Sequence, residues 1–277
     1  MRKAVVAGQF YPEDKTALLE EVKGFIGKRK ENKEIKGVIV PHAGYTYSGK
    51  CAGEVYRLLD LTGKSVILLG VNHQGRGEDI AVSLDDFETP LGIVKNDKIL
   101  SEKIIEISET AKKDEPTHLY EHSLEVQLPF LQFLNKDVKI VPIVLKNYNY
   151  QICKKLAFDI YQAIKELKLE KEIIIVASSD FTHFGAGYGF MPFSDNVKEN
   201  LYNLDKGAIK LIEEMDAEKF LNYASKTTIC GSGGIATCIE LCKLLGAKKG
   251  KLVDYYTSGD ITRDYDVAVG YAGLVLI

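Results

Sequence analysis

Six apolar runs of strand length alternate with helical patterns along the chain, and this alternation strongly constrains how it can fold. The runs are Val38–Val40, Val66–Gly70, Val138–Leu145, Ile173–Ala177, Leu252–Tyr256 and Val267–Ile277. Because their apolar residues are mostly contiguous rather than alternating with polar residues, they predict strands that are covered on both faces. The order of strands and helices predicts an α/β fold with a layered central sheet flanked by helices.

The segments between the strands predict helices and one insertion. Two helix faces are marked by apolar residues spaced about one helical turn apart, Leu18, Leu19, Val22, Phe25 and Ile26 for one and Ile152, Leu156, Ile160, Ile164 and Leu167 for the other. The segment Ser83–Asp97 predicts an inserted loop or short hairpin. Since no linker is long enough to separate two domains, residues 1–277 are expected to form one domain.

The composition excludes several classes of protein. With 45% hydrophobic residues, 27% charged residues and a net charge of -3, the chain matches an ordinary globular protein. Short basic runs such as Lys28–Lys30 are typical of solvated helix ends, so no nucleic-acid partner is expected. No apolar stretch approaches the ~18 residues of a membrane span, and the N-terminal segment lacks the apolar core of a signal peptide. The protein is therefore expected to be soluble and cytoplasmic, with no membrane partner.

The five cysteines are expected to be free thiols, because their number is odd and no secretion signal is present. Cys51, Cys153, Cys238 and Cys242 lie in helical patterns and are expected to be small core residues. Cys230 differs because it opens a glycine-rich run ahead of a helix. A helix N-terminus favours the thiolate, which suits a metal ligand or a nucleophile, with an inert buried thiol as the alternative.

Three of the apolar runs lead directly into side chains that can bind a metal. His42 follows the first run, His73 follows the second, and Asp180 and His183 follow the fourth. In open α/β sheets ligands bind at the carboxyl ends of the strands, so parallel strands would bring these groups to one rim. This convergence favours a metal-type site, although any one such histidine is more often a hydrogen-bonded turn or core residue.

A further polar segment, Glu121–Phe130, interleaves polar groups with an apolar helical face. His122 and Glu125 are one helical turn apart and are expected to share a wall of the site. His118 precedes His122 by four residues, but no glutamate follows it in the zincin arrangement, so it is expected at the surface. The glycine-rich turns carry no phosphate-loop signature.

Six ordered motifs give the chain a resemblance to the Memo family. They are Ala7–Pro12, Pro41–Gly49, Asn72–His73, Glu121–Glu125, Ser178–Gly185 and Ile229–Gly231, spread over nearly the whole length. The resemblance implies a fold like that of the class III extradiol dioxygenases. That fold has a central, mostly parallel or mixed sheet flanked by helices, with a metal pocket at one edge.

The resemblance also implies roles for individual residues. His42, His73 and Cys230 match the metal-ligand positions, and the implied cofactor is one metal ion, iron or copper, with zinc as a further option. Asp180 and His183 match a second pair of pocket residues, and His183 falls where the dioxygenases keep an acid–base histidine. A thiolate in place of the dioxygenase carboxylate alters metal preference and redox behaviour, so ring cleavage does not transfer with the fold.

Three hypotheses about function follow. In a metal-dependent oxidoreductase, His42, His73 and Cys230 would hold the metal. His183 would move protons, and Asp180 would orient His183 or an outer ligand. In a metal-free hydrolase or transferase, Cys230 would be the nucleophile, with His183 and Asp180 as base and orienting group.

In the third hypothesis, a non-catalytic module retains the pocket to bind a peptide, a metal or a partner protein. In every case the ligand is an unknown small molecule or peptide. The resemblance implies an AMMECR-type protein and a radical-SAM enzyme as partners.

Overall fold

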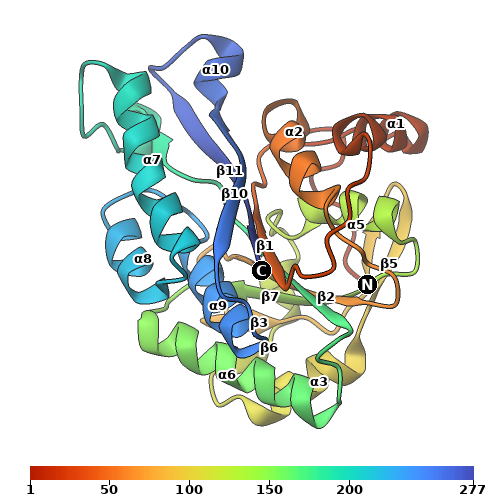
Figure 1. The fold of residues 1–277 in the computed structure, drawn as a ribbon. Coiled ribbons are helices and arrows are strands. Elements are labelled where there is room, and N and C mark those ends of the chain that lie inside the picture. Colours follow the sequence, from red (N-terminus) through yellow and green to blue (C-terminus); the bar gives the residue numbers. More distant parts are fainter.

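A mixed β-sheet runs through the centre of the molecule in the computed structural model, which describes residues 1–277 (Figure 1). The strands are β1 (Gly37–Val40), β2 (Ser65–Val71), β3 (Ile80–Val82), β4 (Phe87–Thr89), β5 (Gly92–Asn96), β6 (Ala111–Lys113), β7 (Lys139–Leu145), β8 (Ile173–Ser178), β9 (His183–Phe184), β10 (Gly250–Thr257) and β11 (Ala268–Leu276). The main strand order is β10-β11-β1-β8-β2-β7-β3-β6. The six apolar runs coincide with β1, β2, β7, β8, β10 and β11 to within two residues at each end.

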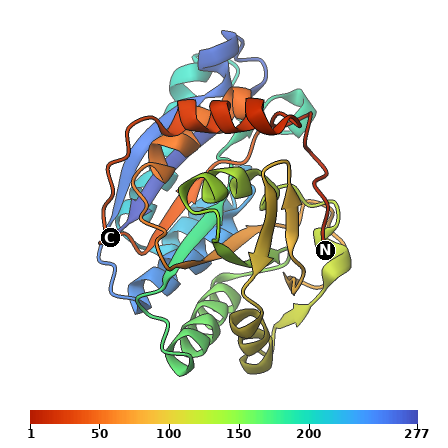
Figure 2. The same ribbon diagram turned by 90° about the vertical axis from the view of Figure 1, so that its right-hand side faces the viewer.

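Helices cover both faces of this sheet. They are α1 (Lys15–Ile26), α2 (Tyr45–Tyr56), α3 (Lys98–Ile107), α4 (Glu115–His118), α5 (Leu128–Leu134), α6 (Tyr150–Glu166), α7 (Val197–Glu213), α8 (Ala217–Ala224), α9 (Ser232–Leu244) and α10 (Ser258–Thr262), with the 3-10 helices η1 (Glu125–Gln127) and η2 (Ala186–Tyr188). Helices α1, α2 and α5 pack on one face, and α3, α6 and α9 pack on the other (Figures 1 and 2). None of the helices combines the length and the apolarity that a membrane span needs.

Burial on both faces explains why the central strands are continuously apolar. In β1, Val38 and Val40 belong to the core beneath α1, α2 and α5, whereas Ile39 belongs to the core beneath α6 and α9. Successive side chains of a strand point to opposite faces, so a strand covered on both sides needs an apolar residue at every position. The layered α/β arrangement expected from the sequence is confirmed.

The strand directions place the candidate residues at one edge of the sheet. β1 is parallel to β8, and β2 is parallel to both β8 and β7, so the carboxyl ends of these four strands lie together. Three of them end just before His42, His73 and Asp180. β11 is antiparallel to β1, and β9 pairs with β11 through His183 and Val269. The sheet is therefore mixed, and the parallel strands at its centre end beside the candidate site.

The inserted segment forms the hairpin that its turn residues predict. β4 and β5 are antiparallel, with Thr89 opposite Gly92. β5 also pairs with the beginning of β7, through Lys95 and Asn96. The hairpin therefore extends the sheet instead of separating two parts of the chain.

Candidate metal centre

A cavity of about 580 Å³ opens at the carboxyl ends of the parallel strands. Five of the residues singled out in the sequence line it, namely His42, His73, His122, Asp180 and His183. Aromatic side chains form much of the remaining wall, and these are Phe10, Tyr47, Tyr188 and Tyr271. The cavity therefore combines imidazole groups with an apolar surface, as binding sites for small molecules commonly do.

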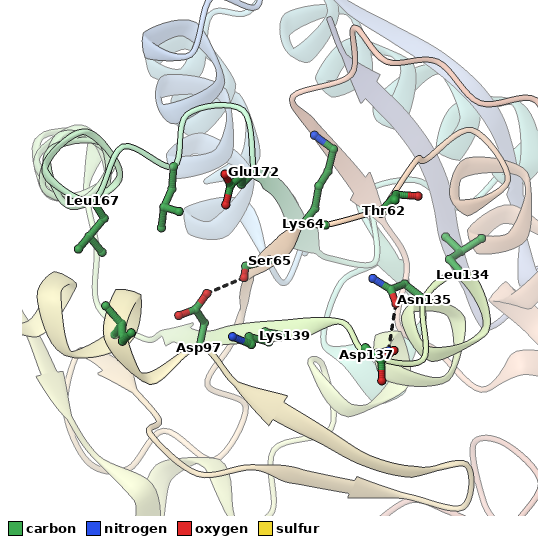
Figure 3. A pocket seen from close by; sticks show the side chains of 13 residues that line it. Thr62, Lys64, Ser65, Asp97, Leu134, Asn135, Asp137, Lys139, Leu167 and Glu172 are labelled. Carbon is green, nitrogen blue, oxygen red and sulfur yellow. Dashed lines mark hydrogen bonds between the residues drawn. The ribbon is translucent and has the colours of Figure 1, made fainter.

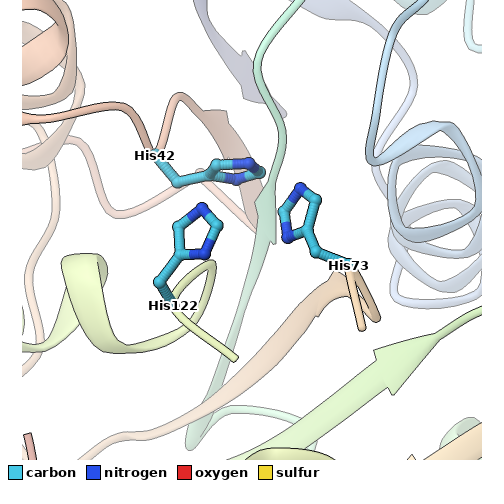
Figure 4. Close-up of side chains that lie close together, drawn as sticks. All are labelled: His42, His73 and His122. Atoms are coloured by element: carbon cyan, nitrogen blue, oxygen red, sulfur yellow. The ribbon is translucent and has the colours of Figure 1, made fainter. Parts of the chain in front are cut away.

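Three histidines from separate segments converge in this cavity (Figure 4). One ligand atom each from His42, His73 and His122 lies within 4.8 Å of the other two. The rings of His73 and His122 are stacked with centroids 4.6 Å apart, and the ring of His42 stands edge-on to both. Two nitrogens on one metal ion are at most about 4.2 Å apart, so a small shift of these side chains would let one ion contact all three.

Hydrogen bonds determine which ring nitrogen of His42 faces the cavity. Ser178 Oγ donates its single proton to the carbonyl of Ser123 at 2.7 Å and accepts a bond from Gln127 Nε2 at 2.8 Å. His42 Nδ1, 3.0 Å from the same hydroxyl, must then donate to it. His42 Nε2 is left unprotonated and can only accept, and Cys230 Sγ lies 3.3 Å from it. Burial lowers the pKa of His42 to about 3, so the ring is neutral near pH 7.

Glu121 orients His73 through a carboxylate. Glu121 Oε1 lies 2.9 Å from His73 Nδ1, and Oε2 accepts a bond from the His73 backbone N–H at 2.7 Å. Burial opposes ionisation of this carboxyl group, but the bonds from His73 and from the Ser123 N–H lower the pKa of Glu121 to about 2. An ionised carboxylate can only accept, so His73 Nδ1 is the donor and Nε2 carries the free lone pair.

His183 is oriented by the main chain. Its Nδ1 lies 3.1 Å from the carbonyl oxygen of Thr228, and its backbone N–H donates to Thr228 Oγ1 at 2.8 Å. A carbonyl oxygen can only accept, so Nε2 of His183 is also unprotonated in the neutral ring. The ring packs edge-on against Tyr188, with centroids 5.0 Å apart.

Of the two roles expected for Asp180, orienting His183 or an outer ligand, the first does not occur, because Asp180 accepts no hydrogen bond from the His183 ring. Its Oδ1 accepts a bond from the backbone N–H of His42 at 2.7 Å, while Thr228 takes the orienting place beside His183. Burial raises the pKa of Asp180, whereas the nearby His183 and the bond from His42 oppose the rise. Asp180 therefore links the loop after β8 to the loop after β1.

Cys230 lies next to His42, outside the cavity lining. Its Sγ is 3.3 Å from His42 Nε2 and 3.6 Å from the carbonyl oxygen of Asp180. The following Gly231 permits this approach, because a Cβ there would lie only 2.6 Å from the carbonyl oxygen of Ser178. The three ligand atoms within 4.8 Å of one another do not include Cys230 Sγ.

The protonation of Cys230 differs from our expectation. The residue precedes α9, whose N-terminus was expected to favour the thiolate. Burial and the nearby Asp180 carboxylate instead raise the pKa of the Cys230 thiol. Without a metal ion the thiol is therefore protonated. The other four cysteines are buried and free, as expected of core residues.

Glu125 lies away from the cavity wall on which we expected it. It is completely buried and forms an ion pair with Arg2. Its carboxylate also accepts bonds from the backbone N–H groups of Val5 and Val6 at 3.0 and 3.1 Å. The expectation assumed that His122 and Glu125 share a helix, but η1 begins only at Glu125.

His118 is buried, so its expected surface position is wrong. Its side chain is 1% exposed, and its Nε2 lies 3.1 Å from the carbonyl oxygen of Ala81 in β3. Burial lowers the pKa of His118 to about 4. His118 is thus a neutral core residue, held by the backbone of a strand.

Sequence reasoning missed the residues that orient the rings. Glu121, Ser178 and Thr228 accept the Nδ1 bonds of His73, His42 and His183. Glu121 offered a weak signal, because it is an acidic residue directly before a histidine in one of the motifs. Ser178 opens the motif Ser178–Gly185, but nothing in the sequence marked its hydroxyl as an acceptor, and nothing singled out the main-chain carbonyl of Thr228.

A second cavity, of about 710 Å³, lies at the opposite ends of β2 and β7 (Figure 3). Its lining includes Lys64, Ser65, Asp97 and Lys139 but no histidine or cysteine. Ser65 Oγ donates to Asp97 Oδ2 at 2.5 Å, so these two polar groups already satisfy each other. Ligands of open α/β sheets bind beyond the carboxyl ends of the strands, which also favours the histidine cavity as the functional site.

The fold and the cavity together define an α/β protein with a histidine-rich, metal-type site at the carboxyl ends of parallel strands. The family model described as Memo-like protein matches residues 2–275. The chain therefore belongs to the Memo family, as its motifs predicted.

Relatives with the same family name extend over the whole chain. MEMO1 family proteins of Aquifex aeolicus and Pyrococcus furiosus are 41% and 40% identical to it, with 100% of this chain and 99% of each relative covered. Among solved structures, an uncharacterized protein of Escherichia coli K12 has a TM-score of 0.50 at 10% identity, covering 86% of this chain and 99% of that one. This last similarity concerns the fold alone.

Proposed function

We propose that the chain is a metal-binding protein whose cavity holds one ion through His42 and His73, with Cys230 as the third ligand. The observation that carries the proposal is the orientation of the two rings. Each ring donates from Nδ1, to a hydroxyl or a carboxylate, and keeps an unprotonated Nε2. Histidines that ligate metals characteristically donate their other ring N–H in this way, which fixes the tautomer before the ion arrives.

Two side chains compete for the third position. Cys230 Sγ is 3.3 Å from His42 Nε2, and a bound cation deprotonates a coordinating thiol despite its raised pKa. His122 is the alternative, since its ring belongs to the three-histidine group. Burial lowers the pKa of His122 to about 4, so this ring is neutral as His42 is, but its Nδ1 is 3.8 Å from Glu121 Oε1, too far for the hydrogen bond that orients the other two rings. We place Cys230 on the metal and His122 on the wall beside it.

The donor set fits a reactive metal rather than a purely structural one. Three protein ligands leave a coordination position open, as in catalytic sites. Two imidazoles and a thiolate suit copper or zinc, and histidines also ligate iron. When bound, copper or iron would supply redox chemistry to a small molecule in the cavity, whereas zinc would act only as a Lewis acid. His183 Nε2 would accept or return a proton there, because its Nδ1 is held by Thr228.

The metal-free hydrolase is less well supported. The Cys230 thiol lies beside His42 and not beside a base oriented by Asp180. Burial raises the pKa of Cys230 and lowers that of His42 to about 3. The pair therefore stays neutral, whereas a cysteine nucleophile needs a thiolate.

Metal titration tests the proposal. Protein purified without oxygen is titrated with Fe(II), Cu(I) and Zn(II) as wild type, His42→Ala, Cys230→Ser and His122→Gln, with Cys153→Ser as a control remote from the cavity. We expect one ion per chain, no binding by His42→Ala, weakened binding by Cys230→Ser and wild-type binding by the other two variants. A wild-type protein that takes up none of these metals contradicts the proposal.

Two other outcomes change its details. Loss of binding in His122→Gln with wild-type binding in Cys230→Ser would assign the third position to His122. Tight binding without turnover of any small molecule would favour the non-catalytic module. The AMMECR-type and radical-SAM partners remain predictions.

A further inference from the structure

Arg2 carries a charge that is almost completely buried, with a side chain only 1% exposed. Its guanidinium group has three acceptors, all supplied by one stretch of chain. Nε donates to the carbonyl of His118 at 3.0 Å, Nη2 to the carbonyl of Glu121 at 2.5 Å, and Nη1 to the carboxylate of Glu125. A buried cation persists only when it is paired and hydrogen-bonded, and the rigid fork of arginine matches acceptors in several directions.

The stretch that Arg2 contacts has little regular structure of its own. α4 ends at His118 and η1 begins at Glu125, so residues 119–124 form a connection between them. This connection supplies two groups to the candidate metal centre. They are Glu121, whose carboxylate orients His73, and His122, whose ring joins the histidine group.

Arg2 is itself held firmly by the β4 hairpin. Its backbone N–H donates to the carbonyl of Asp86 at 2.9 Å, and its carbonyl accepts a bond from the Glu88 N–H at 2.8 Å. The guanidinium carbon lies 5.2 Å from the centroid of the Phe87 ring, within the range of a cation–π contact. The donors that hold residues 118–125 are therefore anchored to a sheet.

The same N-terminal segment continues to the cavity. Glu125 accepts bonds from the backbone N–H groups of Val5 and Val6, which ties the segment to the beginning of η1. Phe10, further along the segment, lines the cavity and packs edge-on against the ring of His122, with centroids 5.0 Å apart. Residues 2–10 thus contact the backbone of the connection through Arg2 and the ring of His122 through Phe10.

We propose that Arg2 is a positioning residue of the metal centre, which acts by holding the connection that carries Glu121 and His122. This inference rests on the metal-binding function proposed above. Arg2 touches no proposed ligand and lies 119 residues before Glu121 in the chain. Lysine is not equivalent to it, because the three donors of an ammonium group radiate from one nitrogen, whereas Arg2 donates from three nitrogens of a rigid plane.

Arg2→Lys and Arg2→Met test the proposal, with Ile160→Ala in the buried face of α6 as a control for lost stability. Zn(II) affinity is measured by competition with a chelator, stability by urea unfolding, and the imidazole signals of the metal-free proteins by NMR. We expect both Arg2 variants to bind Zn(II) ~10- to 100-fold more weakly, the usual effect of changing the residues behind metal ligands. Ile160→Ala should bind as the wild type does.

The NMR measurement separates positioning from a general loss of stability. In the Arg2 variants the signals of His73 and His122 should move, while those of His183 should not, because Thr228 holds that ring. Unmoved His73 and His122 signals, or wild-type affinity in Arg2→Lys, would overturn the proposal. So would an equal loss of affinity in Ile160→Ala.

Two further results are informative. If the wild type bound no metal, the proposed function would fail, but the NMR signals would still decide whether Arg2 positions the two rings. If neither Arg2 variant folded, Glu125→Gln would replace them, since it weakens the same ion pair and keeps the shape of the side chain. The same shifts of His73 and His122 are then expected, and their absence would count against the proposal.

Discussion

His73 and His183 line the same cavity and both bond through Nδ1, but their acceptors differ in kind. His73 depends on the carboxylate of Glu121, 48 residues away in the chain. His183 depends on the main-chain carbonyl of Thr228. A point mutation can remove a carboxylate but not a carbonyl. The orientation of His73 therefore depends on the side chain of Glu121, whereas that of His183 depends only on the path of the backbone at Thr228.

The acceptor of His73 is charged and that of His183 is neutral, which favours different roles for the two rings. A carboxylate behind an imidazole makes the ring a better metal ligand, as in the carboxylate–histidine–metal arrangement. A neutral carbonyl fixes the tautomer without adding a negative charge, which suits a ring that exchanges a proton with a bound ligand. From this comparison we expect His73 to ligate the ion and His183 to transfer a proton, and each expectation can be tested.

Among the variants that test the comparison of His73 with His183, Glu121→Gln is expected to have the largest effect. The amide keeps the shape and one acceptor, but it removes the negative charge behind His73. Metal affinity should fall ~10- to 100-fold in a competition titration. Glu172→Gln, in the lining of the other cavity, provides a matched control that should bind as the wild type does. Equal affinity of Glu121→Gln and the wild type would remove the distinction between the two rings.

The second prediction concerns Asp205, which supports the strand end that carries His183. Its carboxylate accepts bonds from the Thr182 N–H at 3.2 Å and the Tyr255 hydroxyl at 2.7 Å. Burial raises the pKa of Asp205 to about 6, above its unfolded value. Its contribution to stability is therefore present at pH 4 and is lost as the pH rises through about 6.

Asp205→Asn should abolish this loss. The lowered pKa values of His42, His118 and His122 act in the opposite sense over the same range, so the effect is measured as the difference between the variant and the wild type. Relative to that of Asp205→Asn, the free energy of unfolding of the wild type should fall by about 2 kcal/mol between pH 4 and pH 7, because the pKa of Asp205 is raised to about 6. Urea unfolding of the metal-free protein across this range measures it. Glu121 should act in the opposite sense, because its lowered pKa gives stability that is lost as the pH falls towards 2. A wild-type slope in Asp205→Asn would contradict the assignment.

The smallest effect on metal binding is expected from His183→Ala. If His183 moves protons and does not ligate the ion, the metal content should stay near the wild-type value. Any activity on a ligand in the cavity should fall ~10²-fold or more, the usual size of lost acid–base assistance. Metal analysis beside His42→Ala is the measurement. Equal loss of metal in both variants would show that His183 is a ligand.

Sequence patterns predicted the fold and the edge of the sheet at which the site lies, but not the course of residues 118–125. Helical spacing between His122 and Glu125 suggested one shared face. In the structure only His122 lines the cavity, and Glu125 bonds the N-terminal segment. The reason is that Arg2 donates to the carbonyls of His118 and Glu121, which are therefore bonded to a side chain and not to the backbone N–H four residues later that an α-helix would supply. Such long-range contacts leave no periodic trace in a sequence.

The sequence by itself determined the layered α/β plan, because strands buried on both faces require apolar residues at every position. It also determined that His42, His73 and Asp180 follow strands whose carboxyl ends meet once the strands are parallel. Only the tertiary structure decided which nitrogen of each ring faces the cavity. Those tautomers depend on acceptors such as Ser178, 136 residues from His42, and a hydrogen bond over that separation exists only after the chain has folded.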